Sequence, residues 1–157
     1  MATTSSPFNW YDHGIKNLSL PTILTDDIRV ILVTSAYTPD AATHLYYDAD
    51  ITNEHGTSSG YTIGGLALTT KTLTSSVAGQ WIFSSDNPIW SVSGTNLVSR
   101  LFVLYNNTPV SNKPLIGYGY LNNNGGSPLD VTTAPGYTQT ITVPVGGWFN
   151  TGKINGS

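Results

Sequence analysis

Five side chains that could bind a metal or carry protons lie within a dozen residues of one another: His44, Asp48, Asp50, Glu54 and His55. Carboxylate oxygens and imidazole nitrogens are common ligands of hard and borderline cations. Their spacing does not match the calcium loop of an EF-hand, which also needs a central glycine. We therefore expect a polar surface loop whose Asp and Asn side chains bond to the backbone, with no metal bound; a metal site is the alternative.

Hydrolytic chemistry has no matching motif in the chain. An esterase of the α/β-hydrolase type carries its serine in a Gly-x-Ser-x-Gly turn, which the sequence lacks. A glycosidase needs two carboxylates that face each other across a cleft, whereas the one glutamate and eight aspartates lie mostly in turn-like contexts such as Asp26–Asp27. We therefore predict no catalytic residue, no cofactor-binding residue and no cofactor, in a protein that is not an enzyme.

Charged residues make up only 10% of the 157 residues, against roughly 25% in an ordinary soluble domain. Either partners cover part of the surface, or the abundant Thr, Ser and Asn solvate it without charge. The net charge is -3, and the six Lys and Arg residues are scattered. Nucleic acid and anionic membrane surfaces both require clustered basic residues. We therefore expect neither nucleic acid nor a membrane as a partner.

The chain contains no cysteine, which excludes disulfides, thiolate metal sites and cysteine nucleophiles. The opening residues Met1–Ser6 have neither the basic nor the apolar region of a secretory signal. No apolar run approaches the roughly 20 residues that a membrane-spanning helix needs. We therefore expect synthesis in the cytoplasm of the producing cell.

Beta-branched and aromatic residues dominate, and turn residues punctuate the chain at short intervals, which predicts an all-β fold. We expect a single antiparallel β-sandwich domain, similar to a jelly roll, that spans residues 1–157. The predicted strands are Ile28–Val33, Leu66–Leu73, Trp81–Phe83, Leu101–Tyr105, Leu115–Leu121 and Thr138–Val143. Ile28–Val33 and Leu101–Tyr105 are apolar at every position except Arg29, so both faces must be covered and these are the expected central strands. Thr138–Val143 alternates and is expected near an edge.

One short helix is predicted from Pro39 to about Tyr46. Thr38 is its expected cap, Pro39 suits the first helical position, and Asp40 complements the positive end of the helix dipole. The two ends of the chain, about residues 1–9 and 150–157, are polar and are expected to be flexible arms.

Two pairs of aromatic residues lie near the chain ends: Trp10 and Tyr11, and Trp148 and Phe149. Aromatic residues are enriched in protein interfaces. Because Trp148 and Phe149 follow the last predicted strand, we predict that these four residues anchor an interface. Packing in the domain core is the alternative, and exposed aromatic rings could also stack on sugars.

The order of motifs resembles a family of small virion structural proteins of tailed bacteriophages. The resemblance rests on the run IRVILVTSAYTPD…NEHGTSSGYTIGG, within Asp27–Gly65, followed by W…LVSRLFVLY…PLIGYGYL, within Trp90–Leu121. These segments cover about half of the chain, and the part from Val131 onward matches the family poorly.

The resemblance implies an all-β virion protein without enzymatic activity, located on the capsid surface. Its implied role is that of a decoration, or cement, protein that binds the major capsid protein and staples neighbouring subunits, itself as a homo-oligomer and possibly a trimer. No catalytic residue carries over. A tail or baseplate structural protein and a carbohydrate-binding, lectin-like adhesion module are the alternatives.

Overall fold

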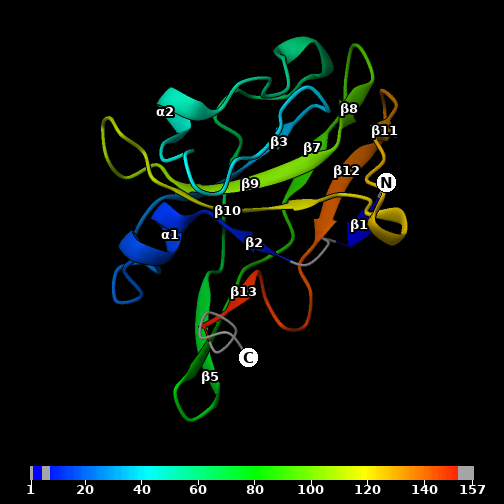
Figure 1. Cartoon of the computed structure of the whole chain (residues 1–157). Helices are drawn as coiled ribbons and strands as arrows, with labels where there is room; N and C mark the ends of the chain where they lie inside the picture. Colours follow the sequence, from blue (N-terminus) through cyan, green and yellow to red (C-terminus); the bar gives the residue numbers. More distant parts are fainter. Residues whose placement is uncertain (1, 5–7, 152–157) are drawn as a thin grey trace.

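The computed structural model describes residues 2–4 and 8–151, and its secondary structure is mostly β-strand (Figure 1). The predicted all-β class is confirmed, whereas the predicted single sandwich stays a prediction because the strands pair in four separate sheets. The strands are β1 Ala2–Thr4, β2 Asn9–Trp10, β3 Ile28–Val33, β4 Leu66–Ala67, β5 Thr72–Val77, β6 Gln80–Ser84, β7 Ile89–Ser91, β8 Leu97–Ser99, β9 Leu101–Asn106, β10 Leu115–Tyr120, β11 Val131–Thr133, β12 Thr138–Thr142 and β13 Phe149–Asn150.

The largest sheet has five strands in the order β2-β10-β9-β3-β4, all antiparallel to their neighbours. Its two central strands, β3 and β9, are those that the sequence predicts, and every residue of β3 except Arg29 is buried. Alternate side chains point to opposite faces, so Val30 and Leu32 join one apolar cluster while Ile31 and Val33 join another. The sheet is therefore covered on both faces.

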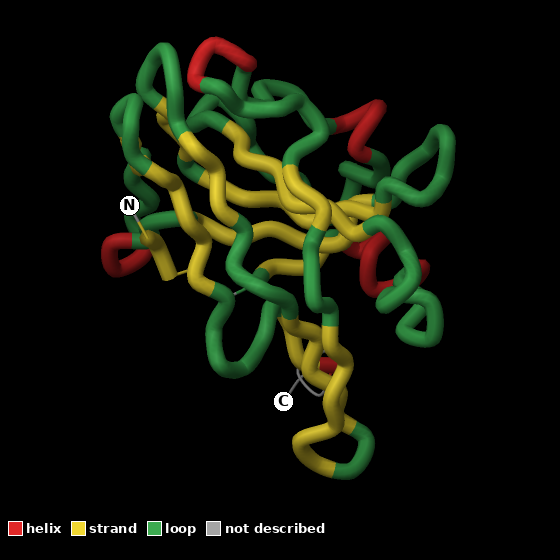
Figure 2. Tube along the Cα trace, turned by 180° about the vertical axis from the view of Figure 1, so that it is seen from behind, coloured by secondary structure: helices red, strands yellow, loops and turns green. Residues whose placement is uncertain are grey.

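The three smaller sheets supply the cover for one face. Their orders are β1-β12-β7, β11-β8 and β13-β6-β5. Each contributes to the cluster that contains Val30 and Leu32: Trp90 from β7, Leu97 from β8 and Phe83 from β6 are all buried there. The opposite face is covered by the loop between β3 and β4 and by Tyr11. Figure 2 shows the β5–β6 hairpin projecting from this body.

The helix predicted from Pro39 to about Tyr46 is wrong: only a turn lies at residues 41–43. Asp40, rather than Thr38, caps this turn, because its Oδ1 accepts hydrogen bonds from the N–H groups of Ala42 and Thr43. The N–H of His44 completes one helical turn by donating to the carbonyl of Asp40, but the N–H groups of residues 45–46 donate to the carboxylate of Asp50 and so cannot extend a helix. Short helices form instead at α1, Asp12–Asn17, and α2, Tyr47–Asp50.

Two other sequence predictions are corrected. The strand predicted at Leu66–Leu73 is interrupted, because Thr70 has a φ of 48°, in the left-handed region that breaks a strand. The strand predicted near an edge, β12, lies between β1 and β7. Of the expected arms, residues 1, 5–7 and 152–157 lie outside the described residues, while Ala2–Thr4 pair with β12 and Asn9 pairs with Tyr118.

The turn before β4 depends on Gly65, which has a φ of 69° and lies against the backbone of Val30, where a Cβ atom would overlap the carbonyl group. We expect Gly65→Ala to lower the free energy of unfolding by about 4 kcal/mol. Gly79→Ala is the control: its φ is 81°, but a Cβ there meets open space, so only the backbone strain of about 1 kcal/mol applies. Urea denaturation measures both, and equal losses would contradict the close packing at Gly65.

Candidate functional site

Glu54 is the centre of the polar loop between β3 and β4. Its half-buried carboxylate accepts hydrogen bonds from the hydroxyl of Tyr47 at 2.6 Å, the hydroxyl of Tyr61 at 2.8 Å and the N–H of Gly64 at 2.7 Å. Tyr61 is only 3% exposed, so its hydroxyl donates to Glu54 and not to solvent. The only glutamate of the chain is therefore occupied in joining three parts of this loop.

His55 is also held inside the fold. Its Nδ1 donates to the carbonyl oxygen of Gly56 at 2.8 Å, and its Nε2 accepts from the N–H of Val98 at 3.3 Å. The two bonds require the neutral ring with its proton on Nδ1, because a carbonyl can only accept and a backbone N–H can only donate. This arrangement ties the loop to β8 and leaves neither ring nitrogen for a metal.

The two aspartates of the loop bond to backbone N–H groups, as the sequence analysis expects. Asp48 accepts from Asn112 at 2.9 Å and from Lys113 at 3.0 Å, and Asp50 accepts from Tyr46 at 2.8 Å. The Lys113 N–H, followed by that of Asn112, lowers the pKa of Asp48, and the Tyr46 N–H lowers the pKa of Asp50. Both carboxylates are thereby held ionised, the opposite of what a general acid needs.

The fifth candidate, His44, lies at the end of a chain of buried tyrosines. The hydroxyl groups of Tyr11 and Tyr37 are 2.8 Å apart, and that of Tyr37 is 2.8 Å from Nδ1 of His44. The five candidates therefore point to different partners. Within residues 2–4 and 8–151, no three His, Asp or Glu side chains come together as a possible metal site. Sequence reasoning missed Tyr37 and Tyr61, because an isolated tyrosine carries no motif.

Of the four aromatic residues predicted as interface anchors, Trp10, Trp148 and Phe149 pack in the apolar cluster on one face of the central sheet, and Tyr11 packs in the cluster on the other face. Tyr11 is fully buried, Trp148 is 3% exposed and Phe149 is 4% exposed, while Trp10 is half-buried. The rings of Trp10 and Phe149 are 4.6 Å apart between centroids. Burial of Tyr11, Trp148 and Phe149 in a single chain corrects the prediction that they anchor a partner.

Trp148 and Phe149 are buried because the last strand returns to the middle of the fold. The Trp148 N–H donates to the carbonyl of Phe83 at 2.8 Å, and its indole N–H donates to Ser85 at 2.9 Å. Its ring packs on Phe102 of the central strand β9 at 5.3 Å. Phe149 lies 5.2 Å from the ring of Phe83.

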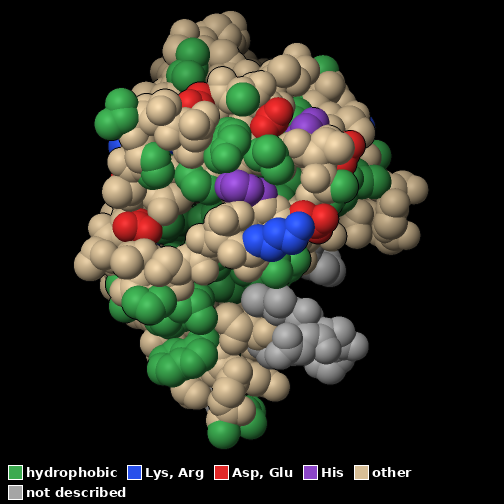
Figure 3. Space-filling model, turned by 60° about the vertical axis from the view of Figure 1, so that its left-hand side comes forward, with side chains coloured by type: hydrophobic (Ala, Val, Ile, Leu, Met, Phe, Trp, Pro, Cys, Tyr) green, Lys and Arg blue, Asp and Glu red, His purple; other side chains and the backbone are tan. Residues whose placement is uncertain are grey.

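A different surface carries exposed apolar side chains, and we call it the apolar end. It consists of Val77 and Trp81 on the β5–β6 hairpin and Val145 on the neighbouring turn, which are 59%, 41% and fully exposed. Residues 72–85, which form the hairpin, contain no charged residue. Figure 3 shows hydrophobic side chains at this lower end of the molecule, with the charged side chains of that face on the body above. The apolar end is the candidate functional surface.

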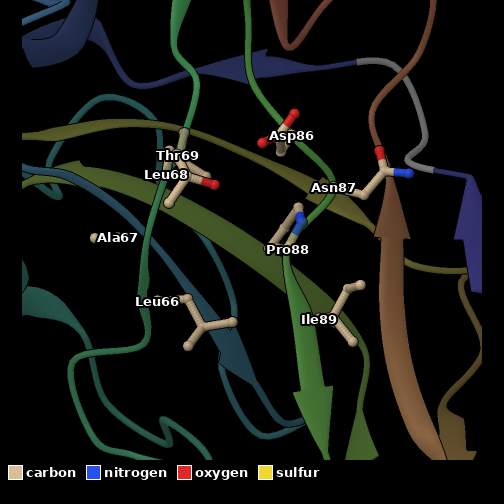
Figure 4. A pocket seen from close by; sticks show the side chains of 8 residues that line it. All are labelled: Leu66, Ala67, Leu68, Thr69, Asp86, Asn87, Pro88 and Ile89. Atoms are coloured by element: carbon tan, nitrogen blue, oxygen red, sulfur yellow. The ribbon is translucent and has the colours of Figure 1, made fainter.

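A groove of about 220 Å³ lies between residues 66–69 and 86–89 (Figure 4). It lies between the edge strands β4 and β7, and Leu66 and Ile89 line its two sides. Ligand pockets usually enclose about 300–1,000 Å³. Asp86 is its one titratable side chain, and its carboxylate accepts a hydrogen bond from Thr70. The groove therefore has neither the size nor the groups of an enzyme active site.

Comparisons with protein-family models, with curated proteins and with solved structures find no match to this chain. Among the described residues, no helix is both long and apolar enough to cross a bilayer.

Trp148 and Trp81 form a matched pair that tests the corrected assignment. Trp148→Ala removes a buried ring, so the free energy of unfolding should fall by about 3–5 kcal/mol. Trp81→Ala removes a ring that is 41% exposed, so the loss should be about 1 kcal/mol or less. Thermal and urea denaturation measure both. Similar small losses for the two variants would restore the interface assignment of Trp148.

The buried tyrosines predict sensitivity to alkali. Burial raises the pKa of Tyr37 and that of Tyr105 to about 12, and raises those of Tyr11 and Tyr61 further. In the unfolded chain these groups ionise near pH 10. A pKa that is higher in the folded state adds stability below pH 10, and this stability is lost as the pH rises through 10 to 12.

We therefore expect the midpoint of urea denaturation to fall steadily above pH 10. Tyrosinate absorbance at 295 nm should show that these four tyrosines stay protonated in the folded protein at pH 11 and ionise together on unfolding. Complete ionisation of all nine tyrosines in a folded protein at pH 11 would contradict the hydroxyl network.

Proposed function

We propose that the chain is a non-enzymatic structural protein of a tailed-bacteriophage virion, a decoration protein that binds the outer capsid and staples neighbouring major capsid subunits. The observation that carries the proposal is the apolar end on an uncharged, projecting hairpin. Interface cores are depleted in charged residues and enriched in aromatic ones, as Trp81 and the hairpin around it are. The sequence resemblance to virion structural proteins supplies the kind of partner.

The two resembling segments fold into the scaffold rather than into the apolar end. Asp27–Gly65 contains β3 and the Glu54 loop, and Trp90–Leu121 contains β8, β9 and β10. These strands meet in the register β3–β9 and β9–β10. The hairpin lies between the two segments in sequence. The resemblance therefore supports a shared fold, while the contact surface is proposed from the exposed side chains.

The state of the acidic groups supports a non-enzymatic role. Glu54 is bonded to two tyrosines, and Asp48 and Asp50 are bonded to backbone N–H groups. Each holds the loop that covers one face of the central sheet. Carboxylates that accept tyrosine and backbone hydrogen bonds in this way hold the loop in place.

Strand pairing and a hydrogen bond join the base of the apolar end to the fold, which suits a stapling contact. β6 lies between β13 and β5, and the turn that carries Val145 leads directly into the Trp148–Phe83 hydrogen bond. A preformed surface loses less conformational entropy on binding than a mobile one. Many such copies on a capsid lattice would add their contacts through multivalency.

Co-sedimentation with empty shells of the major capsid protein encoded in the same genome tests the proposal. We expect the chain to pellet with the shells at a fixed ratio and Trp81→Ala to lower the bound fraction by about fivefold or more. Tyr137→Ala is the control, since Tyr137 is an exposed aromatic residue on the β11–β12 turn, and it should bind normally.

A chain that stays in the supernatant at all concentrations would overturn the capsid assignment. Binding to defined sugars on a glycan array, with loss in Trp81→Ala or Tyr137→Ala, would instead establish a carbohydrate-binding module, in which aromatic rings stack on the sugar.

A further inference from the structure

The outer edge of the projecting hairpin is an unpaired strand. β5 ends the sheet ordered β13-β6-β5, and among the described residues no strand pairs with its other side. β5 has six residues. The edge strands of the five-stranded sheet, β2 and β4, have two each, and the edge strand β7 has three. Short edges offer few groups for unwanted pairing, so β5 stands apart from the others.

The hydrogen bonds of β6 show which way its backbone groups point. The carbonyl of Phe83 accepts from the N–H of Trp148, next to β13, and the Trp81 N–H donates to the hydroxyl of Thr151 on the same side. Successive residues of a strand direct their N–H and C=O groups to alternate sides. Ile82 therefore directs its groups toward β5.

The same alternation fixes the groups of β5. Thr74 is opposite Ile82, and the two exchange hydrogen bonds as a pair. Leu73 and Ser75, the neighbours of Thr74, consequently direct their N–H and C=O groups away from β6, toward the open edge. A bulge between Ser75 and Val77 ends the regular part of the strand. Leu73 and Ser75 thus present a short, regular row of donors and acceptors.

Apart from its bulge after Ser75, this edge lacks the charges and the proline that usually protect an edge strand against pairing. Natural edges carry Lys, other charges or Pro, but residues 72–85 contain no charged residue and no proline. The flanking charges are engaged within the chain: the ammonium of Lys71 donates to the carbonyl of Asp26, and the carboxylate of Asp86 accepts from Thr70. Neither of these two flanking charges is therefore directed at a strand that would approach β5.

We propose that two copies of the chain pair through this edge, β5 against β5 and antiparallel, about a two-fold axis at Thr74. In this register Leu73 of one copy exchanges hydrogen bonds with Ser75 of the other, and the reverse, so that all four outward-pointing residues are satisfied. Thr74 lies opposite its own copy as a non-hydrogen-bonded pair. The two hairpins then form one continuous six-stranded sheet.

The absence of charge on β5 favours a second copy of the chain as the partner of this edge. An isologous contact places the same segment on both sides, so any charge on β5 would face a like charge nearby, which destabilises a strand pair. An uncharged edge is what such a contact requires, whereas an edge that received a charged partner strand would gain from complementary charges. The tip of the hairpin carries only Ala78 and Gly79, which are small enough to pass the base of the partner hairpin. The inference holds whether or not the chain binds a capsid.

Single cysteine substitutions test the register of the β5–β5 pair, since the chain itself contains no cysteine. Cα atoms of a non-hydrogen-bonded antiparallel pair are about 4.5 Å apart, within the range for a disulfide. Thr74→Cys should therefore form a disulfide-linked dimer on mild oxidation. Thr72→Cys is the matched control, because Thr72 is also exposed. In the proposed register, however, Thr72 of one copy would lie four residues along the strand from Thr72 of the other copy, a separation of about 14 Å. This variant should remain uncrosslinked.

Charge reversal tests the interface in solution. By sedimentation velocity over a concentration series, the unmodified chain should show a monomer–dimer equilibrium. Thr74→Lys alone and Thr74→Glu alone should each raise the dimer dissociation constant by about fivefold, as directly opposed like charges do. An equimolar mixture of the two variants should restore the dimer, since opposite charges then face each other.

Three results would overturn the proposal: a monomer at every concentration, a dimer that Thr74→Lys does not weaken, or equal cross-linking of Thr72→Cys and Thr74→Cys. A monomer whose Thr74→Lys variant loses binding to capsid shells would show that the edge receives a capsid strand instead. Dimerisation without capsid binding would leave this inference intact and remove only the proposed function.

Discussion

The antiparallel pairing of β3 with β9 is the constraint on which the remaining structure depends. Both strands are apolar at almost every position, so their pairing creates a ribbon that must be covered on both faces. One face receives the side chains of three small sheets. In the part of the chain that the structure describes, no sheet covers the other face, which is closed by the long loop between β3 and β4 and by Tyr11. The location of each other element follows from this division.

A loop that covers an apolar face brings its own polar groups out of water. Buried polar groups need hydrogen-bond partners, and the backbone hydrogen bonds of the loop are those of separate turns and bridges rather than of a continuous strand ladder. Side chains therefore supply them: Glu54 binds two tyrosine hydroxyl groups, His55 bonds at both ring nitrogens, and Asp50 accepts two N–H groups. The residues that look like a reactive cluster in sequence are the residues that allow the loop to lie on the sheet.

The sequence predicts the strands best where a single local property decides them. The runs at Ile28–Val33 and Leu101–Tyr105, apolar except for Arg29, are central strands because a central position covers both of their faces. The helix at Pro39–Tyr46 fails since Asp50, which lies beyond the segment, binds the N–H groups that a helix would use. The prediction that Trp148 anchors an interface fails for a similar reason. Its partners Phe83 and Phe102 are distant in sequence, and no local pattern shows that the last strand returns to the middle of the fold.

The exposed hairpin combines two properties that a soluble monomer usually avoids, a long free edge and apolar side chains without nearby charge. The chain has few charges, yet it places Asp27 beside Arg29 and Asp130 beside Arg100, within its body, at 2.9 and 2.8 Å. One charge moved to residues 72–85 would protect the edge at little cost to the fold, since Thr74 is exposed. The open edge and the apolar end are best explained together. The strand edge supplies backbone hydrogen bonds, which do not depend on the side chains. The side chains of Val77 and Trp81 supply the apolar contact that makes such pairing favourable in water.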